Sequence, residues 1–335
     1  MNQTGQGFLP QTVTLEISGF STDQGGQVVV LLFTVILGIS VFLNFGVVMA
    51  CLYNRFISPM LLYISLSSLS VTFWGIAGVS CYFQRIIIRQ QVISFNGCLV
   101  QIFTIYFTLF LQFLTTWLMY VDRHWAIFHP YSYIALMANK GGAVKLAIVV
   151  TIFGLLLSIS YVVITTKLVF CNSSLVVKDV FCTASVVAKS ACGNVYFSIL
   201  FTLSGLYFVY GLTGLTAFYS TYCIVRKCRK SSTEANAKAL HTCFTQLFAS
   251  LTQFLSLVFI SILKRFVQLP TVDFFVGIIG MVAPALMNPL IFGLRIQEIR
   301  LTFIRVFHEL HLKCRHDVLE SNMLQKTKKK QITLL

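Results

Sequence analysis

An acidic and a basic side chain stand next to each other at the end of a long apolar run, where Asp122 precedes Arg123. A guanidinium at the edge of a hydrocarbon layer is costly unless an anion lies close to it, and the adjacent carboxylate is the simplest partner. Such a pair can serve as a static salt bridge at a helix end, or it can be the charged element of a switch. For an arbitrary Asp-Arg pair the static role is the better interpretation, so the surrounding residues have to decide.

The chain has the composition of a membrane protein. Hydrophobic residues make up 57% of it and charged residues only 10%, and the mean hydropathy is +0.83. Soluble domains carry about 25% charged residues. A helix crosses roughly 30 Å of hydrocarbon with about 20 apolar residues, and lipid offers no partner to an open backbone group, so the spans must be helical.

Charge-free windows of that length occur seven times, which predicts an all-α membrane protein built as a seven-transmembrane-helix bundle. The predicted spans are Val28 to Leu52, Pro59 to Phe83, Cys98 to Val121, Leu146 to Thr166, Asn194 to Val225, Ala239 to Leu263 and Phe274 to Leu294. The stretch from Trp125 to Asn139 is also poor in charge. It contains Pro130 and several polar residues, and we predict a loop there rather than a span.

Basic residues are distributed unevenly over the two sides of these spans. Eighteen of the 25 lysines and arginines fall on the side of Arg123 and the C-terminal tail. The positive-inside rule therefore places the N-terminus outside. We predict an extracellular tail (1–27), a seven-helix transmembrane domain (28–294) and a cytoplasmic tail (295–335). The net charge of +15 reflects this topology and attraction to anionic lipid rather than nucleic-acid binding.

Glycosylation acceptors and cysteines agree with this orientation. Asn2 and Asn172 each begin an Asn-X-Ser/Thr tripeptide on the predicted outer side. The same side holds four of the ten cysteines, which are Cys98, Cys171, Cys182 and Cys192. Disulfides are expected at that oxidising surface, and the sequence alone leaves all three pairings open.

The residues that follow the Asp-Arg pair, in the segment MYVDRHWAIFHPYSY, resemble the end of the third helix of odorant (olfactory) receptors. The segment KALHTCFTQL, beginning at Lys238, resembles the motif that opens the sixth helix in this family. The segment PALMNPLIFGLR, with Asn288 and Pro289, resembles the seventh-helix motif, and the continuation Gln297 to Arg300 is similar to fish-type members in particular. Three motifs in the right order indicate the family strongly.

This resemblance implies a rhodopsin-like G-protein-coupled receptor, multi-pass in the plasma membrane of olfactory sensory neurons. The implied partners are a small-molecule odorant, membrane lipid and a stimulatory, olfactory-type heterotrimeric G protein that raises cyclic AMP, with no cofactor and no metal. In such receptors Asp122 would hold Arg123 at rest, and Asn288 and Pro289 would complete the G-protein switch. The resemblance also implies two disulfides, Cys98 with Cys182 and Cys171 with Cys192.

The chain departs from the family pattern at several positions. No acidic residue occurs from Pro59 to Phe83, where the wider receptor class keeps a carboxylate for a polar network or a sodium ion. Phe292 replaces the tyrosine expected after Pro289, and Gln246 stands where histidine is usual. His124 and Trp125 replace the residues that usually follow the arginine. These differences are compatible with a divergent member with altered basal activity and with a chain under relaxed constraint, and the uninterrupted reading frame favours the former.

Helical spacing predicts which side chains face the interior of the bundle. The third span presents an apolar stripe when it is counted from Cys98 and Arg123, and the spacing of the family adds residues from the fifth, sixth and seventh spans. The predicted ligand-binding residues are Ile105, Tyr106, Leu109, Phe110, Gly205, Leu206, Val209, Phe254, Leu257, Ser261, Ile278 and Met281, with Phe113 on the same stripe. Such a cavity favours a small, largely apolar ligand, and the lack of a buried acid disfavours an amine. Helix packing is the alternative for each residue taken singly.

Other functional classes fit the sequence less well. A transporter more often shows internal repeats or charged helices at the membrane midplane. A membrane enzyme needs paired titratable residues, and within the spans only His241 is a candidate, so we predict no enzymatic activity. A rhodopsin-like receptor for a peptide or for a steroid or bile-acid-like molecule is the serious alternative. Lys264 and Arg265 would suit an anionic ligand of that kind, although such residues more often snorkel to the interface.

The spacing of apolar and charged residues in the tail that follows the last span predicts a short amphipathic cytoplasmic helix. Its apolar side is formed by Ile299, Phe303, Val306, Phe307 and Leu310, and its charges include Arg300, Arg305 and Lys313. A helix with these two faces lies along a membrane surface. We expect it on the inner leaflet.

Overall fold

The computed structural model describes residues 10, 12–15, 24–55, 58–82, 92–138, 141–171, 174–177, 181–230, 240, 243–244, 246–256, 282–293, 296–306 and 308–309. The helices are α1 (Gln24–Tyr53), α2 (Pro59–Tyr82), α3 (Phe95–Phe128), α4 (Pro130–Tyr133), α5 (Gly141–Thr166), α6 (Ala184–Lys189) and α7 (Tyr196–Lys230). Beyond α7, residues 246–256, 282–293 and 297–306 are also helical. The predicted sixth and seventh spans are therefore helical where the structure describes them.

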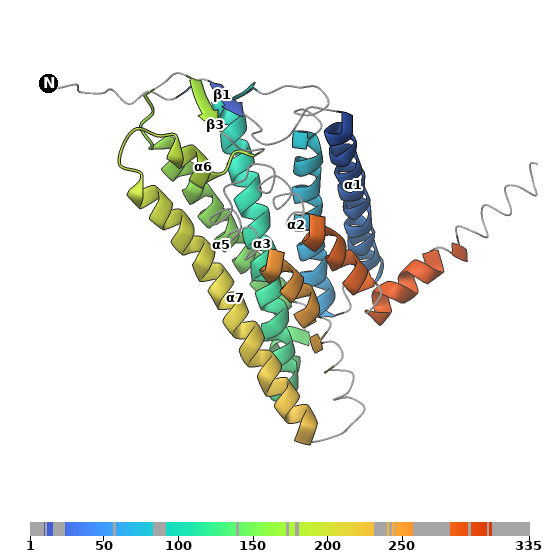
Figure 1. Ribbon diagram of the computed structural model, residues 1–335. Helices are drawn as coiled ribbons and strands as arrows, with labels where there is room; N and C mark the ends of the chain where they lie inside the picture. The colour runs from blue at the N-terminus through green and yellow to red at the C-terminus, as the bar shows by residue number, and fades with distance from the viewer. Residues whose placement is uncertain are drawn as a thin grey trace, which may run out of the picture.

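Five of these helices, α1, α2, α3, α5 and α7, are long and apolar enough to cross a membrane. They stand side by side as one bundle (Figure 1). Large apolar side chains stay exposed on the outward faces, with Phe42 of α1 and Phe218 of α7 each 75% exposed. Apolar faces of this extent suit lipid and not water as the surrounding medium. The five helices coincide with the first five predicted spans.

Helix α3 lies in the middle of the bundle and packs against α2, α5 and α7 (Figure 1). Its buried residues run from Phe95 at one end to Asp122 near the other. The apolar core continues outward from α3 to fully buried aromatic residues on neighbouring helices, such as Tyr63 and Tyr161. The helix with the Asp-Arg pair is thus packed on several sides by its neighbours in the bundle.

A small three-stranded sheet covers one end of the bundle (Figure 1). Its strands β1 (Thr12–Leu15), β2 (Val92–Ser94) and β3 (Ser174–Val177) lie in the order β2-β1-β3. Strand β1 pairs antiparallel with β2 and parallel with β3. The all-α prediction missed this sheet because strands of three and four residues are too short to show a periodic pattern.

The stretch from Trp125 to Asn139 is helical where it is described, except at His129 between α3 and α4, so the prediction of a loop was wrong. Helix α3 continues to Phe128, and α4 then begins at Pro130, followed by one π-helical turn from Ile134 to Ala138. Proline suits the first position of a helix because its fixed φ is helical and its missing N–H is not needed there. The proline that indicated a loop therefore marks the start of a new helix.

The helix at 297–306 packs against the foot of α1. Ile299 is completely buried, and Asn54 donates a hydrogen bond to the Thr302 hydroxyl at 2.7 Å. Leu301 and Ile304 are exposed by 48% and 60%, respectively. The exposed apolar side of this helix therefore differs from the predicted one. Ile299, predicted to face the membrane, is buried in the bundle, whereas Leu301 and Ile304 are exposed.

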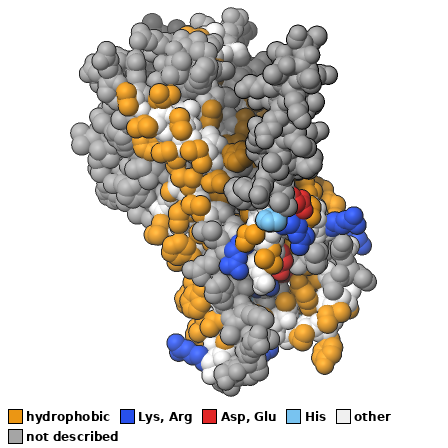
Figure 2. All heavy atoms as spheres, turned by 90° about the vertical axis from the view of Figure 1, so that its right-hand side faces the viewer, with side chains coloured by type: hydrophobic (Ala, Val, Ile, Leu, Met, Phe, Trp, Pro, Cys, Tyr) orange, Lys and Arg blue, Asp and Glu red, His pale blue; other side chains and the backbone are white. Residues whose placement is uncertain are grey.

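Charged side chains are unevenly distributed on one face of the molecule. Figure 2 shows a face on which apolar side chains cover much of the described area, while lysine, arginine and acidic side chains gather in the lower half of the view. This separation is expected of a chain that meets lipid along its length and water at its ends.

Candidate functional site

The carboxylate of Asp122 lies in the penultimate turn of α3 and is almost fully buried, with 1% of the residue exposed. Its Oδ1 accepts a hydrogen bond from the Tyr133 hydroxyl at 2.9 Å. Tyr133 is the last residue of α4. The bond therefore ties the short helix that follows α3 back onto the end of α3.

Tyr133 lies outside the membrane-spanning helices, and its phenol is suited to permanent donation. Burial and the negative charge of Asp122 raise the pKa of Tyr133 above its ordinary value. The hydroxyl consequently keeps its proton at neutral pH. The family motif that begins at Met119 ends at Tyr133, but no role was predicted for this tyrosine. Its place in the same motif as Asp122 was the one feature of the sequence that could have indicated a contact between them.

Arg123 is held differently from its neighbour. One terminal nitrogen of the guanidinium contacts Sδ of Met60 on α2, and its Nε has no hydrogen-bond partner among the described residues. The positive charge also attracts the Asp122 carboxylate. The buried hydroxyl of Tyr63, one turn along α2 from Met60, likewise has no partner in the described part of the chain. The acid is thus anchored by a hydroxyl, while the base keeps unused donor capacity.

A second contact between helices lies beside this pair. Lys227 of α7 donates a hydrogen bond to the Ile127 carbonyl at 2.6 Å, and its ammonium lies 4.9 Å from the centre of the Phe128 ring. The last carbonyls of a helix lack intrahelical donors and carry partial negative charge, so a cation there is favourable. Lys227 therefore links α7 to the end of α3. In the sequence, Lys227 is only one member of a basic cluster at the end of the fifth span, so this role was not predicted.

Asn288 and Pro289 belong to a separate cluster within the helix Val282–Gly293. Asn288 is fully buried and its Oδ1 accepts a hydrogen bond from Gln253 at 3.3 Å. In the same region Asn44 of α1 donates to the Ala285 carbonyl at 2.8 Å. Within the described residues, no hydrogen bond joins Asn288 to Asp122 or Arg123, so the four predicted switch residues form two groups.

The predicted ligand stripe of α3 packs against aromatic residues from three other segments. Tyr106 and Phe110 stack on Tyr161 of α5 with ring centres 4.5 and 5.6 Å apart. Phe113 lies 4.4 Å from Tyr210 of α7 and 5.5 Å from Phe254, measured between ring centres. Phe254 and the α3 stripe are thus brought together, as predicted. Tyr161 was missed because the fourth span carries no motif that fixes its rotation.

The backbone of helix α7 lies close to the same aromatic group at Gly205. A Cβ atom at Gly205 would lie 2.5 Å from the Tyr161 hydroxyl, and that hydroxyl donates to the Thr202 carbonyl at 2.8 Å. Ile105 and Val209 are buried, and Leu109 and Leu206 pack partly buried against the core. The remaining predicted ligand residues, Leu257, Ser261, Ile278 and Met281, lie outside the described residues.

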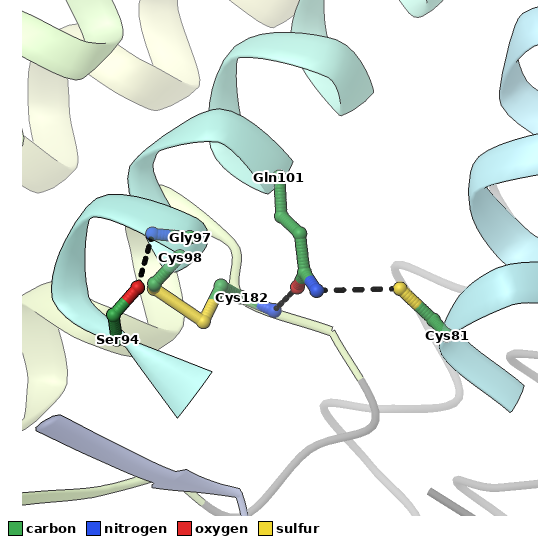
Figure 3. Close-up of a disulfide and its surroundings, with 6 residues drawn as sticks. All are labelled: Cys81, Ser94, Gly97, Cys98, Gln101 and Cys182. Carbon is green, nitrogen blue, oxygen red and sulfur yellow. Dashed lines mark hydrogen bonds between the residues drawn. A yellow bond between two sulfur atoms is a disulfide. The ribbon is translucent and has the colours of Figure 1, made fainter. Parts of the chain in front are cut away.

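Two disulfides fix the end of the bundle that carries the sheet. Cys98 is joined to Cys182 with 5.4 Å between the Cα atoms, and Cys171 is joined to Cys192 with 5.9 Å. Figure 3 shows Gln101 between the first disulfide and α2: its Oε1 accepts from the Cys182 N–H at 3.2 Å, and its Nε2 donates to Cys81 Sγ at 3.3 Å. The glycosylation acceptors Asn2 and Asn172 lie outside the described residues.

The described side chains of this arrangement form an aromatic cluster and a charged pair. In the described part of the chain no three His, Cys, Asp or Glu side chains gather where a metal ion could be held. An aromatic, largely apolar cluster near the middle of the bundle and a charged pair at one end are instead suited to sensing a ligand and relaying its presence.

Comparison with known proteins gives one consistent result. A family model described as "Olfactory receptor" matches residues 29–310. Human olfactory receptor 51I1 is 26% identical over 305 residues, which cover 89% of this chain and 96% of that protein. Human olfactory receptor 51E2 is 28% identical over 221 residues, covering 65% and 68%. Human olfactory receptor 4N4C is 29% identical over 236 residues, covering 70% and 72%.

Proposed function

The chain belongs to the olfactory receptor family, and from that premise we propose that it is an odorant receptor that signals through a stimulatory, olfactory-type G protein and raises cyclic AMP. The family consists of multi-pass membrane receptors and not of enzymes, which confirms the prediction that the chain has no enzymatic activity. The observation that carries the proposal is the buried Asp122 beside Arg123 at the end of the central helix, within a chain matched to this family over residues 29–310.

The proposed topology has seven spans, with the N-terminus outside and residues 295–335 in the cytoplasm. Five apolar helices support it, together with helical segments at 246–256 and 282–293 in the windows predicted for the sixth and seventh spans. The excess of lysine and arginine on the Asp-Arg side supports the orientation. In this topology the sheet and disulfides face outward, and the helix at 297–306 lies along the inner leaflet of the plasma membrane of an olfactory sensory neuron.

The proposed ligand is a small, largely apolar odorant bound next to the aromatic group of Tyr106, Phe113, Tyr161 and Phe254. Burial of apolar ligand surface provides roughly 25 cal/mol per Å², so most of the affinity of a small odorant can come from such walls. The predicted pocket residues that face this group are apolar or aromatic. A charged amine would find no counter-ion among the described side chains of this cluster.

The proposed switch has two positions. At rest, Tyr133 holds the Asp122 carboxylate, and the charge of Arg123 stays close to it. When a ligand favours outward movement of the sixth span, Arg123 becomes available to the G protein. A ligand shifts such an equilibrium only by binding one state better than the other.

The test is a screen of the full-length chain in transfected cells, using a panel of odorants and a cyclic AMP reporter. We expect a concentration-dependent rise for at least one small apolar odorant, absent from cells with empty vector. A response that raises calcium but leaves cyclic AMP unchanged would rule out the stimulatory coupling. A response confined to peptides or to bile-acid-like steroids would favour the alternative receptor class.

The pocket can be tested with a matched pair of glycine variants on α7. Gly205→Ala places a methyl group against the Tyr161 hydroxyl, whereas a Cβ at Gly211 meets nothing within 4 Å. We expect Gly205→Ala, like substitution of Tyr106 or Phe254, to shift the potency of the identified odorant by about tenfold, which corresponds to 1.4 kcal/mol. Gly211→Ala should leave potency unchanged. Equal dose responses for all these variants would refute the placement of the pocket.

A further inference from the structure

Tyr120 lies on α3 two residues before Asp122, and its side chain is completely buried. Its hydroxyl donates a hydrogen bond to the Ser250 hydroxyl at 3.0 Å. Ser250 belongs to the helical segment 246–256, in the window predicted for the sixth span, and is 2% exposed. The hydroxyl of Ser250 in turn donates to the Gln246 carbonyl at 2.9 Å. The phenol of Tyr120 is therefore bonded to a serine that is itself anchored in its own helix.

The same face of the 246–256 segment reaches the aromatic cluster. Phe254 follows Ser250 by four residues, so the two side chains lie one above the other on the helix. The Phe254 ring lies edge-on to Phe113, with 5.5 Å between the ring centres. A Cβ atom at Gly214 of α7 would lie 3.4 Å from the same ring. A molecule that displaces Phe254 therefore acts on Ser250 through a single turn of helix.

The other end of this part of the chain lies near the Asp-Arg pair. Cys243 precedes Ser250 by seven residues and is 1% exposed. The charge of Arg123 acts on its thiol. Phe254, Ser250 and Cys243 thus follow α3 from the aromatic cluster to the proposed switch, with the Tyr120 contact between the two.

Helices α3 and α7 are joined by hydrogen bonds at several levels. These include the bonds from Thr213 to the Phe113 carbonyl at 3.3 Å, from Trp117 to the Thr216 hydroxyl at 3.2 Å and from Ser220 to the Tyr120 carbonyl at 3.3 Å. Between α3 and the 246–256 segment, the described residues form one hydrogen bond, that of Tyr120 and Ser250. Loss of one bond to α7 therefore leaves others in place, whereas loss of the Tyr120 bond leaves the segment with no hydrogen bond to α3 in the described part of the chain.

We propose that the hydrogen bond from Tyr120 to Ser250 is a latch that holds the sixth span against α3 in the resting receptor, with Tyr120 as the positioning residue. This inference rests on the proposed function, because the odorant that displaces Phe254 is what releases the latch. When the bond breaks, Ser250 keeps its bond to the Gln246 carbonyl, and the phenol of Tyr120 loses its partner. An unpaired buried hydroxyl is costly, so the bond persists until a ligand that binds the open state better offsets that cost.

The latch is tested by two measurements on Tyr120→Phe. The first is basal cyclic AMP at equal surface level, which a merely structural defect would not raise. The second is the rate at which N-ethylmaleimide labels Cys243 in the purified, ligand-free full-length receptor in lipid nanodiscs, since this buried thiol reacts when the sixth span leaves α3. Both should rise by about two- to tenfold, the factor that corresponds to the net contribution of one neutral hydrogen bond. Labelling of Cys51, which is completely buried on α1, should stay unchanged in the same sample when it is read by mass spectrometry.

Two further variants separate the latch from general loosening of the bundle. Ser250→Ala removes the acceptor of the same bond and should raise both quantities as well. The double variant should rise no further than the larger of the two single variants, because both substitutions delete one interaction. Thr216→Val is the matched control, since it removes the acceptor of the Trp117 hydrogen bond between α3 and α7 and should change neither quantity.

Unchanged labelling of Cys243 in both Tyr120→Phe and Ser250→Ala overturns the proposal. An equal rise in Thr216→Val, or additive rises in the double variant, overturns it too, because the Tyr120 bond would then have no special role. Faster labelling without any cyclic AMP signal, basal or driven by odorant, keeps the latch and overturns the proposed stimulatory coupling.

Discussion

The two ends of the bundle are held together by different kinds of bond. At the end with the sheet, the Cys98–Cys182 disulfide fixes a connecting segment to α3, the Cys171–Cys192 disulfide closes a loop between α5 and α7, and β1 pairs with β2 and β3. At the end with the Asp-Arg pair, the described links are noncovalent: they include the hydrogen bonds of Tyr133 to Asp122, of Lys227 to Ile127 and of Asn54 to Thr302, and the contact of Arg123 with Met60. The first end is closed covalently, and the second is closed by bonds that thermal motion can break.

The difference indicates which end can move. A hydrogen bond contributes about 0.5–1.5 kcal/mol, or 1.5–3 kcal/mol when one partner is charged. The chain-entropy argument gives up to roughly 4.6 kcal/mol for the loop of 84 residues closed by Cys98–Cys182. A ligand bound between the two ends is therefore expected to move the end with the Asp-Arg pair, which we call the compliant end, more easily than the disulfide-linked end with the sheet, which we call the stiff end. The following substitutions alter that contrast.

The largest expected effect is at the compliant end. Arg123→Ala removes the cation that we propose meets the G protein, and we expect ligand-driven cyclic AMP production to be abolished. Surface labelling of intact cells should show the variant at close to the wild-type level, because the Nε of the guanidinium makes no hydrogen bond to the described residues that the variant would lose. An unchanged dose response would sink the switch assignment.

The second-largest effect is expected at the stiff end, which carries the two disulfides. Cys98→Ser should reduce the amount of folded receptor at the cell surface severely, since it removes the longer of the two covalent loops. Cys171→Ser opens a loop of 21 residues, for which the same argument gives roughly 3.3 kcal/mol, so its loss should be smaller. The measurement is surface labelling normalised to total protein. The opposite ranking of the two variants would contradict this account.

A smaller change is expected when Tyr133 loses its hydroxyl. Tyr133→Phe keeps the ring but leaves the buried Asp122 carboxylate without its donor, at a cost of about 1.5–3 kcal/mol to the resting state. The ratio of active to resting receptor should rise by about tenfold or more, seen as higher basal cyclic AMP at equal surface level. Tyr131→Phe is the control, because Tyr131 is 89% exposed on the same helix. Equal basal signals from both variants would show that the bond does not restrain the switch.

The smallest effect belongs to Lys227. Lys227→Met removes an exposed cation from the end of α3, where such contacts contribute about 0.3–1 kcal/mol. We expect basal cyclic AMP to rise no more than a few-fold. Arg226→Met, an exposed basic neighbour on α7, should change nothing. Equal basal cyclic AMP in the two variants would show that the hydrogen bond to Ile127 does not stabilise the resting state.

Sequence patterns predicted those features of the structure that depend on residues close together in the chain. Long apolar windows indicated the helices, since each must span hydrocarbon alone, and the segment around Asp122 indicated the charged pair. The disulfide partners in the structure are those that the family resemblance implies, although spacing alone left three pairings open. The roles of Tyr133, Lys227 and Tyr161 were not predictable, because each depends on how one helix is rotated and docked against another.

The same limit explains the two structural surprises. Strand β1 has four residues and exists only because β2 and β3 supply hydrogen-bonding partners from distant parts of the chain. The helix α4 begins at a proline that sequence rules associate equally with turns. The rotation of the helix at 297–306 is set by Ile299 entering the core, which a pattern of apolar residues cannot distinguish from contact with lipid.

The central position of β1 also constrains how the protein is made. Thr12 pairs with Ser174, so the strand emerges from the ribosome 162 residues before its parallel partner. At a synthesis rate of about 5–20 residues per second, this strand waits roughly 8–30 s while α1, α2, α3 and α5 are inserted. During that interval an exposed strand and unpaired thiols are available to chaperones and oxidases. Completion of the sheet therefore has to wait until the residues of α1, α2, α3 and α5 have all been synthesised.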